Sequence, residues 1–445
     1  MSLNLYSKTL KDLLMQLPTR TKRVSFTLPA SLHPLTEKYF SIFWAGAFLS
    51  SIGFWIQAVG EGWLVLQLTN SALLLGLVTF AATLPNVVLS LFGGAIADRV
   101  NRRYLLIITQ SVYLSSALTI GILTTLHLIQ VWMIILIALI NGTFSSVGFP
   151  AWQTFISELV SPGELKQGIA LNSMQFNLSR VIGPAIGGIS VGVLGVAGSY
   201  YLNALSYVAI LIPLLVMRPA LRMHTSAERQ SIWQGVREGL SYVRKLPSLQ
   251  LALVLQFVIV FLVFPYATLL PIFANNIFHI GAQGLGLLNS AAGIGALCGS
   301  VLVVLRSQRM EYGPRALIIL GIVGGSACAA FAMAHSLQLA LLLLLVVGAC
   351  AVMASTITNT TVQTMVPEEM RGRVLSLWVL SSAGIGPFGN LVAGWVAQYV
   401  GAPITLMLSG GLCAIIALIV LCWRMQLKPR MVENSIDSCK AVSAK

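Results

Sequence analysis

The sequence predicts an all-α integral membrane protein, with twelve transmembrane helices in two pseudo-symmetric six-helix bundles. Three observations predict this fold: the composition, the spacing of the charged residues, and a repeat shared by the two halves. Of the 445 residues, 57% are hydrophobic and 9% are charged, and the mean hydropathy is +0.86. These values lie far outside the range of soluble globular proteins.

The basic residues divide the chain into apolar blocks. Of the 27 Lys and Arg residues, 26 fall into seven clusters, and the six blocks between them hold about 50 to 60 residues each. A membrane helix needs about 20 apolar residues, so one block can form two spans and a short turn. Every basic cluster then lies on one face, which the positive-inside rule identifies as cytoplasmic.

The predicted spans are helices, because the sequence lacks the period of two that membrane strands require. In chain order they cover 40–67, 72–97, 104–125, 130–154, 166–194, 198–218, 249–274, 282–305, 315–334, 338–362, 373–399 and 403–423. The predicted domains are a cytoplasmic tail (1–38), a first bundle (39–218), a cytoplasmic linker (219–248), a second bundle (249–424) and a cytoplasmic tail (425–445).

The linker contains apolar residues interspersed with Arg and Glu. This pattern predicts an amphipathic helix on the membrane surface. Its apolar positions are Ile232, Trp233, Val236, Leu240 and Val243.

The two halves share a sequence signature. Pro162–Lys166 opens the fifth predicted span and Pro367–Arg371 opens the eleventh, and a Gly-Pro pair follows each about twenty residues later, at Gly183 and Gly386. Parallel six-helix repeats are typical of transporters that bind substrate between two halves.

The segment that joins the second and third spans carries the pattern G-x-x-x-D-R-x-x-R-R at Gly94, Asp98, Arg99, Arg102 and Arg103. It resembles the cytoplasmic loop motif of the major facilitator superfamily, with another residue where a Gly is common. The resemblance covers about residues 39–424 and implies a loop that closes an inner gate in the outward-facing state. The alternative is that these charges are solvated and only set the topology.

A second motif lies in the fifth span, at Arg180, Gly183, Pro184, Gly187 and Gly188. It resembles the G-x-x-x-G-P-x-x-G-G element of exporting members of the superfamily, with Ser179 where a Gly is common. The alternative is a seam of small residues that only lets helices pack closely.

Two charged residues remain inside predicted spans, Glu61 and Arg180. Charges in hydrocarbon are costly, so each is expected to face a cavity or a partner. Glu61 is the candidate site for a proton or a cationic substrate, unless it reaches water beyond the outer gate. Arg180 is either a donor to backbone carbonyls or a counter-ion to Glu61 or to an anionic substrate.

Amide and aromatic side chains in the spans are further candidates for the cavity wall. As a set they favour a large, amphipathic, weakly charged substrate over a sugar or a phosphate. They include Gln57, Trp63, Asn141, Gln153, Asn359 and Gln363.

The motifs above, together with Trp55-Ile56-Gln57 and Gly62-Trp63-Leu64, resemble the efflux branch that includes macrolide and siderophore (enterobactin-type) exporters. The resemblance implies a proton-coupled secondary exporter that works by alternating access, an antiporter in the cell inner (plasma) membrane with both termini cytoplasmic. A proton-linked importer and a membrane-embedded enzyme or receptor are the alternatives.

We expect the partners to be a small-molecule substrate, protons and membrane lipid, and the protein to act as a monomer. The net charge of +14 is spread over seven clusters, which argues against nucleic acid as a partner. No cofactor and no metal site are expected, because no phosphate-binding loop is present and neither Cys nor His residues have metal-ligand spacing.

Overall fold

The computed structural model describes residues 30–97, 100–217, 232–306 and 314–443. These residues are helical almost throughout, and eleven helical segments among them are long and apolar enough to cross a membrane. One of these, Pro162–Val216, has non-helical φ and ψ angles at Gly195 and is therefore two helices that meet at a sharp turn. The structure thus confirms the all-α class that the sequence predicts.

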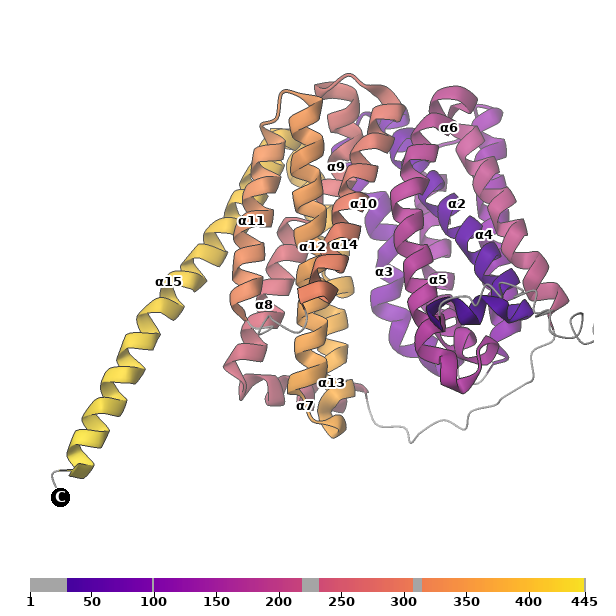
Figure 1. Cartoon of the computed structure of the whole chain (residues 1–445). Helices are drawn as coiled ribbons and strands as arrows, with labels where there is room; N and C mark the ends of the chain where they lie inside the picture. The colour runs from indigo at the N-terminus through magenta and orange to yellow at the C-terminus, as the bar shows by residue number, and fades with distance from the viewer. Residues whose placement is uncertain (1–29, 98–99, 218–231, 307–313, 444–445) are drawn as a thin grey trace, which may run out of the picture.

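The helices form two sets that follow one another along the chain (Figure 1). The first set is η1 (Ala30–Thr36), α2 (Lys38–Thr69), α3 (Ala72–Ala97), α4 (Arg102–Thr125), α5 (Val131–Leu159), η2 (Pro162–Glu164) and α6 (Leu165–Val216). The second set is α8 (Pro247–Leu262), α9 (Tyr266–Ile272), η3 (Phe273–Ile277), α10 (Gly281–Arg306), α11 (Pro314–Ala332), α12 (Leu337–Met365), α13 (Glu368–Val379), η4 (Leu380–Gly384), α14 (Gly386–Val400) and α15 (Ala402–Ser443).

The turns expected on the outer side coincide with residues in the left-handed region of φ. A helix commonly ends at such a residue, because the reversal of φ stops the helical hydrogen bonds. Asn70 after α2 has a φ of 47°, and its N–H donates to the carbonyl of Leu66 at 2.7 Å. Gly195 and Gly401 have φ values of 72° and 87°. The residue types at these positions therefore favour a turn there.

Two predicted spans are not regular helices. The predicted span 249–274 is interrupted between α8 and α9 at Val263–Pro265, where Pro265 lacks the N–H that a continuous helix needs. The predicted span 373–399 contains the π-helical segment η4 just before the Gly386-Pro387 pair. Prolines and π-helical segments are the usual places where a helix departs from a straight axis.

The last helix is longer than expected. The sequence predicts that the final span ends at 423, whereas α15 continues as a helix to Ser443. This helix runs away from the rest of the second set toward its C-terminal end (Figure 1). The helix continues through Pro429, although proline usually ends or kinks a helix.

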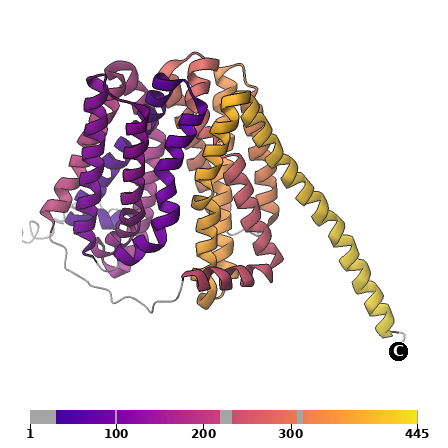
Figure 2. The same ribbon diagram turned by 180° about the vertical axis from the view of Figure 1, so that it is seen from behind.

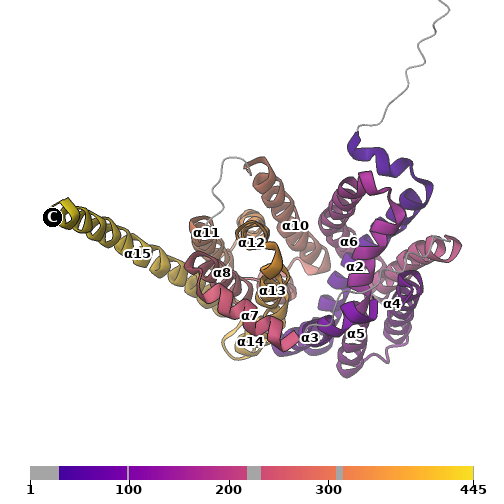
Figure 3. The ribbon, with the colours of Figure 1, turned by 90° about the horizontal axis from the view of Figure 1, so that it is seen from below.

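The linker helix α7 (Ile232–Arg244) lies across the end of the second set, nearly perpendicular to its long helices (Figures 2 and 3). Glu238 forms an ion pair with Arg373 of α13 at 2.5 Å, and Val243 is buried against α8 and α13 residues. The predicted amphipathic helix is therefore present and belongs to the second set.

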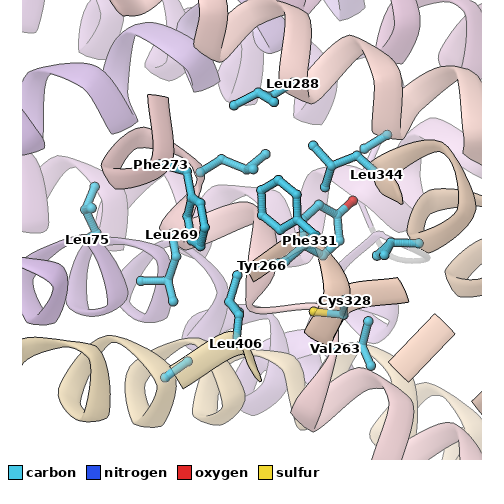
Figure 4. Close-up of a cluster of buried hydrophobic side chains, with 14 of the residues drawn as sticks. Leu75, Val263, Tyr266, Leu269, Phe273, Leu288, Cys328, Phe331, Leu344 and Leu406 are labelled. Carbon is cyan, nitrogen blue, oxygen red and sulfur yellow. The ribbon is translucent and has the colours of Figure 1, made fainter. Parts of the chain in front are cut away.

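The two sets meet through α6 with α10 and through α3 with α14. At both contacts small residues bring backbones together: a Cβ atom added to Gly188 would lie 3.0 Å from the Cα of Gly286, and one added to Gly394 would lie 3.0 Å from that of Gly76. The largest apolar core also joins the sets, since Leu75 of α3 belongs to the same cluster as Phe273 (Figure 4). All these contacts lie toward the ends of the helices that are remote from α7.

Candidate functional site

A cavity of about 770 Å³ lies against the first set and reaches α9 and α10 of the second. Its wall comes from α2, α3, α4, α5 and α6 on one side and from a few residues such as Thr268 and Asn289 on the other. A volume of this size accommodates a drug-sized molecule. The cavity is the natural candidate for a substrate site between two halves.

Glu61 lines this cavity and is the only Asp, Glu, Lys, Arg or His among the described lining residues. Its carboxyl group interacts with the side chain of Gln57, one helical turn earlier on α2. The phenol groups of Tyr200 and Tyr207 on α6 lie close enough to interact with Glu61 electrostatically. The structure therefore places the predicted carboxylate in the cavity, held between α2 and α6.

The amide of Gln57 has a defined orientation, because its Oε1 accepts a hydrogen bond from Asn203 Nδ2 at 2.5 Å. The NH₂ group of Gln57 is then the part left to donate to Glu61. Asn203 is almost fully buried, and its own Oδ1 accepts from Ser206 Oγ at 3.0 Å. Donors therefore run in one direction, from Ser206 through Asn203 and Gln57 to the carboxylate.

Two glycines on α2 allow this network to form. A Cβ atom at Gly53 would lie 2.0 Å from Ser206 Oγ, and one at Gly60 would lie 2.0 Å from Ser199 Oγ. A side chain at either position would displace these side chains of α6. Sequence analysis did not identify Asn203 as a site residue. The only signal in the sequence is that Asn203 is an amide within an apolar span.

The other predicted amide and aromatic candidates separate into three groups. Asn141 and Gln153 line the cavity together with Gln57. Trp63 is buried in the apolar core and is absent from the described cavity wall. Asn359 and Gln363 hydrogen-bond to each other on α12 and are also absent from that wall.

Arg180 lies outside the described wall of the cavity. Its guanidinium group stands over the ring of Trp55, 5.7 Å from the centroid, and interacts with the hydroxyl of Tyr266 on α9. Among the described residues no ion pair joins Arg180 to Glu61. The role of Arg180 as a counter-ion therefore stays a prediction, and its observed neighbours are Trp55 and Tyr266.

The glycines of the span-five motif pack against two neighbours. Gly183 lies against Trp55 and Gly187 against Ile56, so this face of α6 meets α2. Gly188 meets α10 of the other set, and Pro184 lines the cavity. Close helix contact within one set and across the two sets is what small residues permit in a membrane.

The loop motif is described in part. Asp98 and Arg99 lie outside the described residues, and Gly94 is in the last turns of α3. Arg102 forms an ion pair with Glu158 at the end of α5, at 2.7 Å, with both side chains mostly buried. Arg103 donates to the carbonyl oxygens of Leu214 and Leu215 at the end of α6. The described basic residues of the motif thus fasten the ends of α4, α5 and α6 together.

A family model described as "Transmembrane secretion effector" matches residues 29–443. The staphyloferrin A transporter of Staphylococcus aureus is 25% identical over 400 residues, which cover 88% of this chain and 98% of the relative. The multidrug efflux pump Tap of Mycolicibacterium fortuitum is 28% identical over 386 residues (84% and 91%). The enterobactin exporter EntS of Citrobacter koseri is 26% identical over 411 residues (90% and 94%).

Among solved structures, a bacterial homologue of the human lysosomal transporter Spinster, in an inward-facing and occupied conformation, matches with a TM-score of 0.70. The sequence identity is 14%, and the match covers 89% of this chain and 98% of the other, so it shows a common fold. The family resemblance that the sequence predicted is confirmed by the family model and by the efflux-type relatives. This chain belongs to the transmembrane secretion effector family of the major facilitator superfamily, and it is a membrane transporter and not an enzyme.

Proposed function

We propose that this protein is a proton-coupled secondary exporter of amphipathic small molecules. The observation that carries the proposal is a drug-sized cavity that lies against the first helix set and reaches the second, with Glu61 as the single carboxylate among its described lining residues. The names of three relatives support export, since they describe a multidrug efflux pump, an enterobactin exporter and a staphyloferrin A transporter. Amide and aromatic side chains in the same wall suit a substrate that is partly polar and partly apolar.

In the proposed mechanism, Glu61 carries the proton. The donors that run from Ser206 to Gln57 stabilise the ionised carboxylate. A proton on Glu61 removes the charge that these donors stabilise and so changes the balance between the two gate states. With a membrane potential, one coupled proton provides about 2.3 kcal/mol per 100 mV for transport against a gradient.

The gates lie at opposite ends of the cavity. The contacts of α6 with α10 and of α3 with α14 close the outer side in this structure, in the topology that we propose. We assign the inner gate to the loop at Asp98 and Arg99, which follows α3. The basic residues Arg102 and Arg103, which follow this loop, hold the neighbouring ends of α4, α5 and α6 together.

Inverted membrane vesicles test the function directly. An acidic interior should drive accumulation of a labelled amphipathic compound, in a panel of a cationic dye, a macrolide and a catecholate chelator, and an uncoupler should abolish it. Asp98→Asn should reduce this accumulation at least tenfold at unchanged protein level, because the loop no longer favours one gate state. Release of preloaded compound on acidification would instead identify an importer, and no proton-dependent movement of any compound would reject the proposal.

We further propose twelve spans, with 39–218 and 249–424 as the two six-helix bundles in the plasma membrane. The segments 1–38, 219–248 and 425–445 are then cytoplasmic. The basic clusters support this orientation, as does the linker helix α7, which packs at one end of the second set.

Cysteine labelling at the two ends of α12 checks this topology. Gln338 and Glu368 are both exposed. Gln338 lies in the first turn of α12, and Glu368 lies just beyond the last turn of that helix. In a variant without the six native cysteines, Gln338→Cys should react with an impermeant maleimide added outside the cell. Glu368→Cys should react only after the membrane is opened. The opposite pattern would reverse the proposed orientation.

A further inference from the structure

We infer that Arg180 is a positioning residue that joins the cavity wall to the contact between the two helix sets. Its guanidinium group contacts Trp55, a wall residue of the first set, and Tyr266, the first residue of α9 in the second set. In this role Arg180 transmits a change at Trp55 to the position of α9. The inference concerns the link between the cavity and the contact, and it depends neither on the transported compound nor on the coupling ion.

The first argument is the need of an intramembrane cation for partners. Arg180 lies near the middle of the predicted span 166–194, where an unpartnered charge is costly. Its guanidinium group stands over the ring of Trp55, 5.7 Å from the centroid, and interacts with the hydroxyl of Tyr266. None of the ion pairs among the described residues includes Arg180. Because its two neighbours belong to different sets, the cation keeps both only while the sets are together here.

The second argument is the close packing of α6 and α10 at the same level. Ser290 Oγ of α10 donates to the carbonyl oxygen of Val181 at 3.0 Å. A Cβ atom added to Gly293 of α10 would lie 2.6 Å from the carbonyl oxygen of Arg180. The turn of α6 that carries Arg180 therefore packs directly on the second set, which brings the guanidinium group within reach of α9.

The third argument is the interruption of the predicted span 249–274 at Val263–Pro265. The main contacts of α8 are with α7 and with other helices of the second set, whereas α9 also contacts α2 and α3 of the first set. A Cβ atom added to Gly62 of α2, for example, would lie 3.1 Å from Cγ of Pro271. Tyr266 directly follows the interruption. Arg180 therefore holds α9 to the first set at the end of α9 that adjoins the interruption.

The cavity wall continues on both sides of Arg180. Trp55 lines the cavity from the first set, and Ala267 and Thr268, which follow Tyr266 in α9, line it from the second. The ring of Trp55 also adjoins that of Phe176, another wall residue, with a centroid distance of 6.3 Å. A molecule that displaces the ring of Trp55 would therefore remove one support of Arg180 and loosen the attachment of α9.

Cross-linking at a distant contact between the sets tests the inference without a substrate. Ser71 Oγ of α3 donates to Gln398 Oε1 of α14 at 2.8 Å, so cysteines at these positions, in a chain without the six native cysteines, report whether this side is closed. Arg180→Gln removes the charge, and Tyr266→Phe removes only a hydroxyl. In lipid nanodiscs each should slow cross-linking by a short thiol reagent about threefold or more, because a hydrogen bond to a charged group is lost.

Double variants show whether the three residues act as a unit. Arg180→Gln combined with Tyr266→Phe should cross-link no more slowly than the slower of the two single variants. Trp55→Leu should also slow cross-linking about threefold, whereas Trp55→Phe, which keeps a ring face for the cation, should stay within about twofold of the unaltered chain. In the background of Arg180→Gln, Trp55→Leu should have no further effect.

Arg315→Gln is the matched control, because it removes an exposed arginine in the first turn of α11, and it should leave the rate unchanged. An unchanged rate in folded Arg180→Gln or Tyr266→Phe, or reductions that multiply in the double variants, would overturn the inference. Tyr266→Phe carries the test by itself if Arg180→Gln yields no folded protein.

The outcomes for the two proposals are separate. Unchanged cross-linking together with proton-driven transport in vesicles would reject the role of Arg180 and leave the proposed exporter intact. Slower cross-linking in the variants, without proton-driven transport by the unaltered chain, would do the reverse.

Discussion

Glu61→Gln should abolish proton-driven accumulation while leaving the protein folded in the membrane. Glu61 is the only charged residue in the described cavity wall, so no second group there can carry the proton. With one proton exchanged per substrate, a difference of one pH unit supports about a tenfold gradient, since tenfold corresponds to 1.4 kcal/mol. The accumulation ratio of a neutral probe should fall from about tenfold to near one in the vesicle assay.

Substrate exchange separates loss of coupling from loss of the protein. At saturating concentration, exchange of labelled for unlabelled substrate across the membrane should continue in Glu61→Gln, because the amide and aromatic wall is unchanged. Asn203→Leu is a companion variant: without its donor, Gln57 is free to turn, and the pH dependence of transport should shift without complete loss. An accumulation ratio and a pH profile in Glu61→Gln equal to those of the unaltered chain would eliminate Glu61 as the proton site.

Gly188→Leu should reduce transport about tenfold or more by forcing the outer contact open. A Cβ atom there would lie 2.8 Å from the carbonyl oxygen of Ala282 and 3.0 Å from the Cα of Gly286, and backbone atoms cannot rotate away as a side chain can. Overpacking of this kind costs about 1–3 kcal/mol, which corresponds to roughly a 5- to 150-fold change in a two-state population. The population should shift toward the state in which α6 and α10 are apart.

Cross-linking at the second contact between the sets measures that shift. Ser71 Oγ donates to Gln398 Oε1 at 2.8 Å, so cysteines at these two positions should be joined by a short thiol reagent when the outer side is closed. Gly188→Leu should lower the cross-linked fraction, whereas Gly411→Leu should leave it unchanged, because no atom lies within 4 Å of a Cβ added at Gly411. Equal cross-linking and equal transport in both variants would show that the α6–α10 contact is not a gate.

The sequence alone determined the helical class, the family and the approximate bounds of the spans. In a membrane the hydrocarbon requires long apolar helices, and basic residues collect between them, so composition and charge spacing are enough. The turns could also be predicted, because Asn70, Gly195 and Gly401 are residue types that adopt a positive φ, which ends a helix. The amphipathic helix α7 could be predicted because apolar residues alternate with Arg and Glu at helical spacing along its sequence.

Only the tertiary structure decided which face of each span meets the cavity. Lipid-facing and core-facing surfaces are both apolar, so the periodicity of α2 does not show that Glu61 and Gln57 face the cavity while Trp63 faces the core. The contacts of Arg180 with Trp55 and Tyr266 also depend on which faces of the helices meet in the folded protein. The network at Glu61 depends on Asn203, which is 146 residues from Gln57 and comes beside it only when α6 packs on the glycines of α2.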